Sequence, residues 1–351
     1  MQANAQDLLL DSYDYLLPAH LIAESPSKPR SSAKLLVYER QSQSIRHCYF
    51  KDFCSLVPSD YLLVCNDTKV LKARLFGFKD SANTQKRMEI FFHKPQQGTQ
   101  FLVQIKGKIK RHDRIILQND ASIRVNVLEL LDNGLRVVEF ERNALPLNYD
   151  EVLEILQSHG TIPLPPYIKR QSTQQDNIDY QSVFACNLGA VAAPTASLHF
   201  STRDFQRLKE RYKICFVTLH IGAGTFQSVQ SRDIREHVMH TERFHISSSS
   251  QAILSHALDT TKVLCVGTTC ARVVESYARY HKTYGECDLF LHPHNPPISH
   301  FALLTNFHLP KSTLLMLVSA LLGRKTALDL YQEAIRHEYR FYSFGDGMLI
   351  L

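Results

Sequence analysis

The hydrophobic positions follow two different rhythms along the chain. Between Tyr61 and Arg142 the sequence falls into short β-rich runs separated by turn residues: YLLVCN, ARLFGF, RMEIFF, QFLVQI, RIIL, SIRVNV and LRVVEF. This spacing is typical of a small β-barrel or sandwich. Asn133 and Gly134 lie between the last two runs, and an Asn-Gly pair favours a tight type I′ hairpin because both residues tolerate positive φ angles.

Beyond residue 150 the pattern changes to strand followed by helix. YDEVLEILQSHG predicts a helix that ends at Gly160, and STRDFQRLKERYK predicts another that Ser201 or Thr202 caps. The apolar runs ICFVTLH, VLCVG and FALLTNF predict strands, and the last two lead into the helical patterns TTCARVVESYARY and TLLMLVSALLG. Repeated strand–loop–helix units indicate an α/β domain, in which ligands bind in loops beyond the carboxyl ends of strands.

Composition narrows the class of protein only a little. With 351 residues, of which 44% are hydrophobic and 21% charged, the chain is long enough for two domains. The net charge of +6 suits an anionic partner but does not require one. The eight cysteines show no ligand spacing, the N-terminus has aspartates where a signal peptide has basic residues, and the apolar stretches are too short for a membrane span. We therefore expect a cytoplasmic protein without a membrane segment.

Two loops that follow predicted strands carry candidate ligand-binding groups. Thr268 and Thr269 begin a predicted helix, where free N–H groups and hydroxyls can receive a carboxylate or phosphate, although a simple capped helix start has the same pattern. His220 directly follows a strand, and Gly222 and Gly224 allow the backbone to approach a ligand there, although a plain turn has the same pattern.

Histidines mark two further segments. His308 and Lys311 precede an apolar helix whose cap needs only Ser312, so their presence favours a functional loop. His237 and His240 are three residues apart, a spacing that can hold a metal on a helix, but histidines in clefts more often form hydrogen bonds and no third ligand at a recognised spacing is visible.

Basic residues alternate in the segment KGKIKR. Lys106, Lys108 and Lys110 would project from one face of a strand, with Arg111 and Arg114 following. Such a stripe can follow an RNA backbone, or it can simply be the solvated face of the barrel.

These motifs, taken in order, resemble the queuosine ribosyltransferase-isomerase family. The resemblance runs from Tyr13 to the C-terminus and lies in the segments YDYLLPAHLIAESPSKPRSSAKLLV, CNDTKVLKARLFG, PLPPYIKR, DYQSVFA, GAVAAPTASLHF, VTLHIGAGTF, HVMHTE, VGTTCARVVES, LLTNFHLPKSTLLMLVSALLG and YRFYSFGDGML. Agreement over ten ordered motifs is much stronger evidence than any single motif.

The resemblance implies both a reaction and a fold. S-adenosylmethionine, acting as a co-substrate without a metal, would donate its ribosyl group to the aminomethyl arm of a deazaguanine at the tRNA wobble position, with loss of adenine and methionine. The family has an α/β main domain with an inserted small β-barrel domain. We expect residues 1–66 and 151–351 to form the α/β domain and residues 67–150 the barrel. We expect a monomer or a weak homo-oligomer.

Candidate roles follow for residues in the matched motifs. His220 is the favoured base for removing the proton beside the sulfonium, with His308 and His199 as alternatives. Asp67 and Glu275 are carboxylates that can hold ribose hydroxyls or a cationic centre. The candidate contacts to S-adenosylmethionine are Gly222, Gly224, Thr225, Thr268, Thr269, Arg272, Tyr180, Phe184 and Phe226, and the candidate contacts to tRNA are Arg74, Lys106, Lys108, Lys110, Lys311 and Arg340.

One departure from the family pattern and two alternative functions bear on this interpretation. His292 to Asn295 replace a Tyr-Pro-Gly-Tyr-like stretch, which calls the family's tight turn and aromatic contact there into question. A metal-dependent hydrolase would use His237, His240 and Glu242, and tightly held zinc would indicate it. A non-catalytic tRNA-binding protein would keep the basic stripe and fail to bind S-adenosylmethionine.

Overall fold

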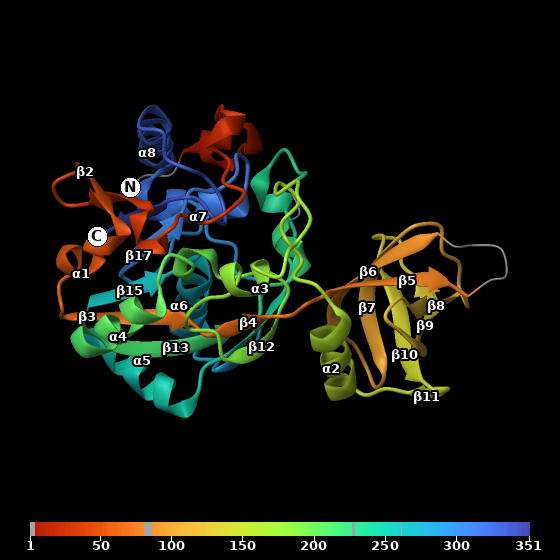
Figure 1. Ribbon diagram of the computed structural model, residues 1–351. Helices are drawn as coiled ribbons and strands as arrows, with labels where there is room; N and C mark the ends of the chain where they lie inside the picture. The colour runs from red at the N-terminus through yellow and green to blue at the C-terminus, as the bar shows by residue number, and fades with distance from the viewer. Residues whose placement is uncertain (1–3, 81–85, 227–228, 261) are drawn as a thin grey trace.

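The chain forms a larger lobe around a mixed β-sheet and a smaller lobe that is a β-barrel (Figure 1). This computed structural model describes residues 4–80, 86–226, 229–260 and 262–351, without the side chain of Phe226. The predicted fold, an α/β domain with an inserted barrel, is confirmed.

The large sheet has parallel strands at its centre. Its order is β16 (Tyr284–Cys287), β14 (Glu242–His245), β13 (Lys213–Leu219), β3 (Tyr61–Asn66), β15 (Lys262–Val266), β17 (Phe301–Asn306), β18 (Gly347–Ile350), β1 (Lys34–Glu39) and β2 (Ser44–Tyr49). Strands β13, β3, β15 and β17 run parallel to one another. The run YLLVCN was grouped with the barrel-type runs, but it is the central strand β3 of this sheet. Its residues 62–66 are all buried, as expected of a parallel strand covered on both faces.

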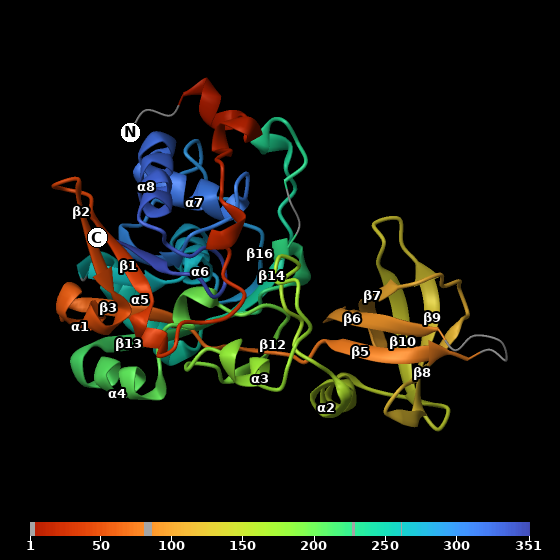
Figure 2. The ribbon, with the colours of Figure 1, turned by 45° about the horizontal axis from the view of Figure 1, so that its top comes forward.

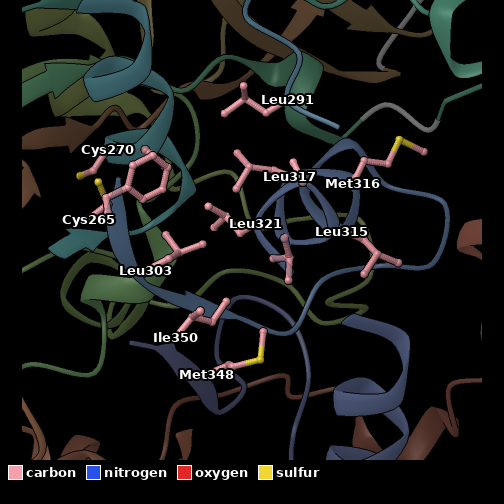
Figure 3. Packing of buried hydrophobic residues seen from close by; sticks show 14 of the residues in the cluster. Cys265, Cys270, Leu291, Leu303, Leu315, Met316, Leu317, Leu321, Met348 and Ile350 are labelled. Atoms are coloured by element: carbon pink, nitrogen blue, oxygen red, sulfur yellow. The ribbon is translucent and has the colours of Figure 1, made fainter. Parts of the chain in front are cut away.

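Helices cover both faces of this sheet. One face packs against α5 (Ser248–Thr260), α6 (Thr268–Tyr280), α7 (Thr313–Leu322) and α8 (Arg324–Arg336), and the other packs against α1 (Phe53–Leu56) and α4 (Thr202–Arg211). Figure 3 shows Leu317 and Leu321 of α7 beside Leu303 of β17 and Ile350 of β18. In the described parts of the chain, no helix is both long and apolar enough to cross a bilayer.

The smaller lobe is a closed antiparallel barrel. The ring runs through β5 (Arg74–Lys79), β6 (Arg87–Pro95), β7 (Gln100–Lys106), β10 (Arg136–Arg142), β9 (Asp120–Leu130) and β8 (Arg114–Leu117), which pairs with β5 again; the short β11 (Leu145–Pro146) extends β10. The parallel pair β4 (Thr68–Val70) and β12 (Asn187–Ala190) lies between the lobes (Figure 2).

Two local predictions in the barrel are wrong. The turn between β9 and β10 is not type I′, because Gly134 has a φ of 84° while Asn133 is not in the left-handed region. Instead the N–H of Gly134 bonds to the carbonyl of Leu131 at 3.1 Å, as in a three-residue loop with a left-handed glycine. The basic stripe is not one strand face either. Strand β7 ends at Lys106 because Gly107, with a φ of 140°, turns the backbone.

Helix α2 (Tyr149–His159) contacts the barrel. Its buried residues Val152, Ile155 and Leu156 belong to the same hydrophobic cluster as the barrel interior. Asn148 caps the helix. The helix ends before Gly160, as the sequence predicts. The domain boundaries at residues 67 and 150 stay a prediction.

Candidate functional site

A cavity of about 380 Å³ lies in the larger lobe at the carboxyl ends of the central strands. Its walls include Ile221 after β13, the segment 267–269 after β15 and the segment 307–314 after β17. This is the edge at which open α/β sheets bind ligands. The volume lies within the range of about 300–1,000 Å³ found for sites of small molecules and cofactors.

The N-terminus of α6 forms one wall. Gly267 stands at the cap position with a φ of 102°, and among the described residues no side chain caps the helix there. Thr268 and Thr269 line the cavity, and the hydroxyl of Thr269 accepts a hydrogen bond of 3.2 Å from Asn66. The free N–H groups of the first turn and the positive end of the helix dipole therefore make this wall suitable for an anion.

Arg272 lines the same wall but is already paired. Its guanidinium bonds to the carboxylate of Glu242 and to the carbonyls of Leu289 and Cys287, at 3.1 and 3.0 Å. Burial raises the pKa of Glu242, but Arg272 and neighbouring donors more than offset this effect and hold the pKa below its ordinary value. The guanidinium of Arg272 is therefore already hydrogen-bonded within the protein and is not available to donate two hydrogen bonds to a substrate carboxylate.

The loop after β17 brings a polar network to the cavity. Thr305 Oγ1 lies 2.7 Å from Nε2 of His308, and Asn306 accepts a hydrogen bond of 2.8 Å from Thr195. For Nδ1 of His308 there is no hydrogen-bond partner among the residues that the structure describes. Burial lowers the pKa of His308 to about 3, so its imidazole is neutral at pH 7. In the tautomer in which Nε2–H donates to Thr305, the lone pair lies on Nδ1.

Aromatic residues also line the cavity. Tyr167, Tyr180, Phe307 and Tyr342 line the cavity, and the rings of Tyr167 and Tyr342 lie 4.6 Å apart. Flat rings of this kind can stack on a purine or deazapurine base.

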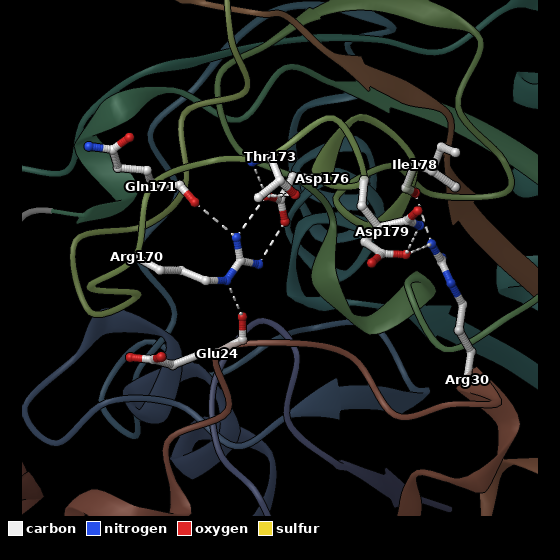
Figure 4. Close-up of polar contacts among 9 residues, drawn as sticks. Glu24, Arg30, Arg170, Gln171, Thr173, Asp176, Ile178 and Asp179 are labelled. Carbon is white, nitrogen blue, oxygen red and sulfur yellow. Dashed lines mark hydrogen bonds and ion pairs between the residues drawn. The ribbon is translucent and has the colours of Figure 1, made fainter.

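Ion pairs hold the segment that carries two of these tyrosines (Figure 4). Arg170 donates two hydrogen bonds of 2.7 Å to Asp176, and its Nε donates to the carbonyl of Glu24 at 3.2 Å. Arg30 donates to the carbonyl of Ile178 at 2.8 Å. Burial alone raises the pKa of Asp176, but the bonds from Arg170 and the backbone outweigh it, and the pKa lies below its ordinary value. The segment is thereby fixed to the N-terminal part of the chain.

The N-terminal segment also contacts the loop after β17. Lys311 has a φ of 56° and forms ion pairs with Asp11 and Asp14 at 2.8 and 3.0 Å. Tyr15 donates a hydrogen bond to the carbonyl of His308. Lys311 lines the cavity, but its ammonium is already paired with two carboxylates.

The cavity is lined by some of the residues that the sequence predicted as catalytic residues or as contacts to S-adenosylmethionine or tRNA. Its described lining includes Tyr180, Thr225, Thr268, Thr269, Arg272, His308 and Lys311. His220, Asp67, Glu275, His199, Gly222, Gly224 and Phe184 are not among these described lining residues. The side chain of Phe226 lies outside the described part of the chain.

His220 and Asp67 lie in a second polar cluster beside β4 and β12. Nδ1 of His220 is 2.8 Å from the hydroxyl of Thr68, and Asp67 accepts hydrogen bonds from Thr218 at 2.6 Å and Asn187 at 3.0 Å. Burial, with Arg243 nearby, lowers the pKa of His220 to about 4. The predicted site residues His220 and Asp67 therefore belong to this second cluster, and neither is among the described residues that line the cavity.

Other predicted residues have structural partners. Glu275 is fully buried and accepts hydrogen bonds from Arg279 at 2.6 Å and from the backbone of Ile298 and Ser299 at 2.7 and 3.1 Å. His199 stacks on Phe50 with ring centroids 3.9 Å apart. These contacts favour structural roles for both side chains.

Further predicted contacts are also used within the protein. The N–H of Gly222 donates to Glu242 at 3.1 Å, and a Cβ at Gly224 would lie 2.5 Å from the ring of His240. Phe184 packs among Phe200, Phe205 and Phe216 in the core. The close approach of His240 thus requires a glycine at position 224, whereas Gly222 contributes its backbone N–H.

The predicted tRNA contacts differ in availability. Arg74 pairs with Glu89 at 3.0 Å, and Arg340 donates to Ser27 and to the carbonyl of Ser25. The lysines of the basic segment, Lys106, Lys108 and Lys110, are exposed. The barrel lysines therefore keep the most freedom to meet a phosphate.

Several lining residues were not predicted. Glu242 was considered only as a metal ligand, and Tyr167, Asn306 and Tyr342 were not assigned. All four residues lie in segments that carry the family resemblance. Membership of these segments, rather than any property of the single residues, was the sequence signal that could have identified them. The segment from His292 to Asn295, which departs from the family pattern, still forms a tight turn. His292 and Asn295 exchange backbone hydrogen bonds of 2.8 and 3.3 Å.

The fold and the cavity together define an α/β ligand-binding protein with an inserted β-barrel. The chain belongs to the queuosine biosynthesis protein family, which it matches over residues 10–350. The family resemblance inferred from the motifs is thereby confirmed.

Individual relatives agree with this assignment. The chain is 53% identical to the S-adenosylmethionine:tRNA ribosyltransferase-isomerase of Helicobacter hepaticus, over 98% of this chain and 97% of that protein. It is 53% identical to the same-named protein of Helicobacter pylori strain J99, over 97% and 99% of the two chains. It also resembles the crystal structure of an S-adenosylmethionine tRNA ribosyltransferase from Thermotoga maritima, with 27% identity, a TM-score of 0.54 and coverage of 97% and 100%.

Proposed function

We propose that this chain is an S-adenosylmethionine:tRNA ribosyltransferase-isomerase. It transfers and isomerises the ribosyl group of S-adenosylmethionine onto 7-aminomethyl-7-deazaguanine at the tRNA wobble position, and releases adenine and methionine. The epoxyqueuosine product belongs to queuosine biosynthesis. The near full-length relatives at 53% identity support this assignment.

One structural observation carries the proposal: a single cavity combines an anion-binding helix end, an aromatic wall and a neutral histidine. The uncapped N-terminus of α6 suits the methionine carboxylate. The aromatic wall suits adenine or the deazaguanine base.

We place the general base at His308 and keep His220 as the alternative. His308 lines the cavity, whereas His220 is held by Thr68 in the second cluster. His308 also has its Nε2 oriented by Thr305, which leaves Nδ1 to accept the proton beside the sulfonium. His199 stacks on Phe50, and its Nε2 lies 3.2 Å from the side-chain nitrogen of Asn306, so this nitrogen is already engaged within the protein.

A matched pair of variants tests both the reaction and the base. Purified protein, S-adenosylmethionine and tRNA carrying the aminomethyl-deazaguanine should release adenine and methionine together, and a nucleoside digest should contain the epoxide. His308→Gln should lower the rate of adenine release by about 10²–10⁴, whereas His220→Gln should stay within about tenfold of the parent. The reverse ranking would place the base in the second cluster, and no release by the parent would exclude the proposed reaction.

The remaining parts of the proposal concern partners. We infer that the exposed lysines of the barrel meet tRNA phosphates, and that the enzyme works without a metal, in the cytoplasm, as a monomer or a weak homo-oligomer. Light scattering of the free protein and of its tRNA complex tests the oligomeric state.

A further inference from the structure

Three metal-ligating side chains meet where β2 lies against the end of α8. His47 comes from β2, Glu333 from the last turn of α8, and His337 from the residue that follows this helix. One nitrogen of each imidazole and one carboxylate oxygen lie within 4.8 Å of one another. The cluster shares no residue with the described lining of the cavity.

The distances fit a tetrahedral ion. Oε1 of Glu333 is 3.4 Å from Nε2 of His47 and 3.1 Å from Nδ1 of His337. Zinc bonds of about 2.0–2.1 Å in tetrahedral geometry separate the ligand atoms by about 3.4 Å. The two half-exposed imidazoles stack on each other with ring centroids 4.1 Å apart and planes 26° apart, and Nδ1 of His337 also lies 3.1 Å from the carbonyl of Glu333. The rings must therefore turn out of this stack to enclose an ion.

Neighbouring groups orient the ligands. Tyr339 lies 2.9 Å from Nδ1 of His47, a contact that directs Nε2 toward Glu333. Arg336 bonds to the other carboxylate oxygen, Oε2, and leaves Oε1 facing the histidines. Glu333 and His337 share one side of α8 because they are four residues apart. Outer contacts of this kind are typical of metal ligands.

We propose that His47, Glu333 and His337 form a binding site for a divalent transition ion, with zinc as the preferred ion. Two imidazoles and one carboxylate are a ligand set that zinc accepts, and water completes the tetrahedron on the exposed side. The ion joins the edge strand β2 to the C-terminal end of α8. Its role is to fasten this part of the lobe, and the ion takes no part in ribosyl transfer.

Cobalt and zinc titrations of the full chain test the site. The parent should bind one zinc ion per chain in competition with a chromophoric chelator, and the affinity should fall at least tenfold in the double variant His47→Asn, His337→Asn. His256→Asn, which changes an exposed histidine on α5, should bind zinc like the parent. Cobalt should give the visible bands of a tetrahedral nitrogen–oxygen site, without a thiolate charge-transfer band.

Stability supplies a second measurement. Without metal, the double variant should unfold at the temperature of the parent, and saturating zinc should raise the unfolding temperature of the parent alone. Unchanged zinc affinity in the double variant, or a cobalt–thiolate band that persists in it, would overturn the proposal. Adenine release should be the same with and without zinc, so a failure here is distinct from a failure of the proposed reaction.

Discussion

Glu242 and Arg272 form a buried ion pair beside the cavity. The two residues are only 2% and 5% exposed, and Arg272 has one carboxylate partner and two carbonyl partners. Glu242→Gln keeps the shape of the side chain but leaves the guanidinium buried without its counter-charge. We therefore expect a large loss of stability from a change of a few atoms.

The size of the loss follows from burial. Removing one partner of a buried ion pair costs about 3–5 kcal/mol. Unfolding entropy of about 2.1 cal/mol/K per residue amounts to about 0.7 kcal/mol/K for a chain of 351 residues. The expected fall in Tm is therefore about 4–7 °C.

Thermal unfolding followed by circular dichroism measures this fall. Asp329→Asn, which breaks the exposed pair with Lys325, should leave Tm unchanged. The double variant Glu242→Leu, Arg272→Met should regain much of the loss, because it removes both charges. A fall below 1 °C for Glu242→Gln would refute the reasoning.

The pH dependence gives a second check on the same pair. The folded pKa of Glu242 lies below its ordinary value of 4.5, so the stabilising effect is complete above that value. It is lost as the pH falls through the folded pKa. The difference in Tm between parent and Glu242→Gln should therefore be constant near neutrality and shrink in acid.

Three further predictions concern function. The rate of adenine release should be insensitive to chelators. If a chelator abolished adenine release and only zinc restored it, catalysis would not be metal-free. Replacing Lys106, Lys108 and Lys110 by alanine should lower tRNA affinity and flatten the dependence of log affinity on log salt by about one unit per lost contact, and an unchanged slope would make these lysines ordinary surface residues. Asp176→Asn removes charged hydrogen bonds from Arg170, each worth about 1.5–3 kcal/mol, that hold the segment carrying Tyr167 and Tyr180. The variant should therefore raise KM for S-adenosylmethionine more than it lowers kcat. A loss of kcat alone would argue against a role of this pair in positioning the segment.

The sequence by itself determined most of the elements and several of the loops that line the cavity. Hydrophobic periodicity and capping residues are local signals, so the helix after Ser201 and the strand–loop–helix unit around Thr268 could be identified from neighbouring residues alone. His308 was likewise placed correctly in a loop after a strand. The ordered motifs also identified the family.

Only the tertiary structure decided which side chains share a site. Arg272 on α6 is paired with Glu242 on β14, thirty residues away in sequence, and His220 meets Thr68, because the fold brings distant elements side by side. Periodicity shows that a residue is buried but does not name its partner, which depends on sheet order and on contacts between distant segments. The cluster of His47, Glu333 and His337 has the same cause, since β2 and α8 come from opposite ends of the chain.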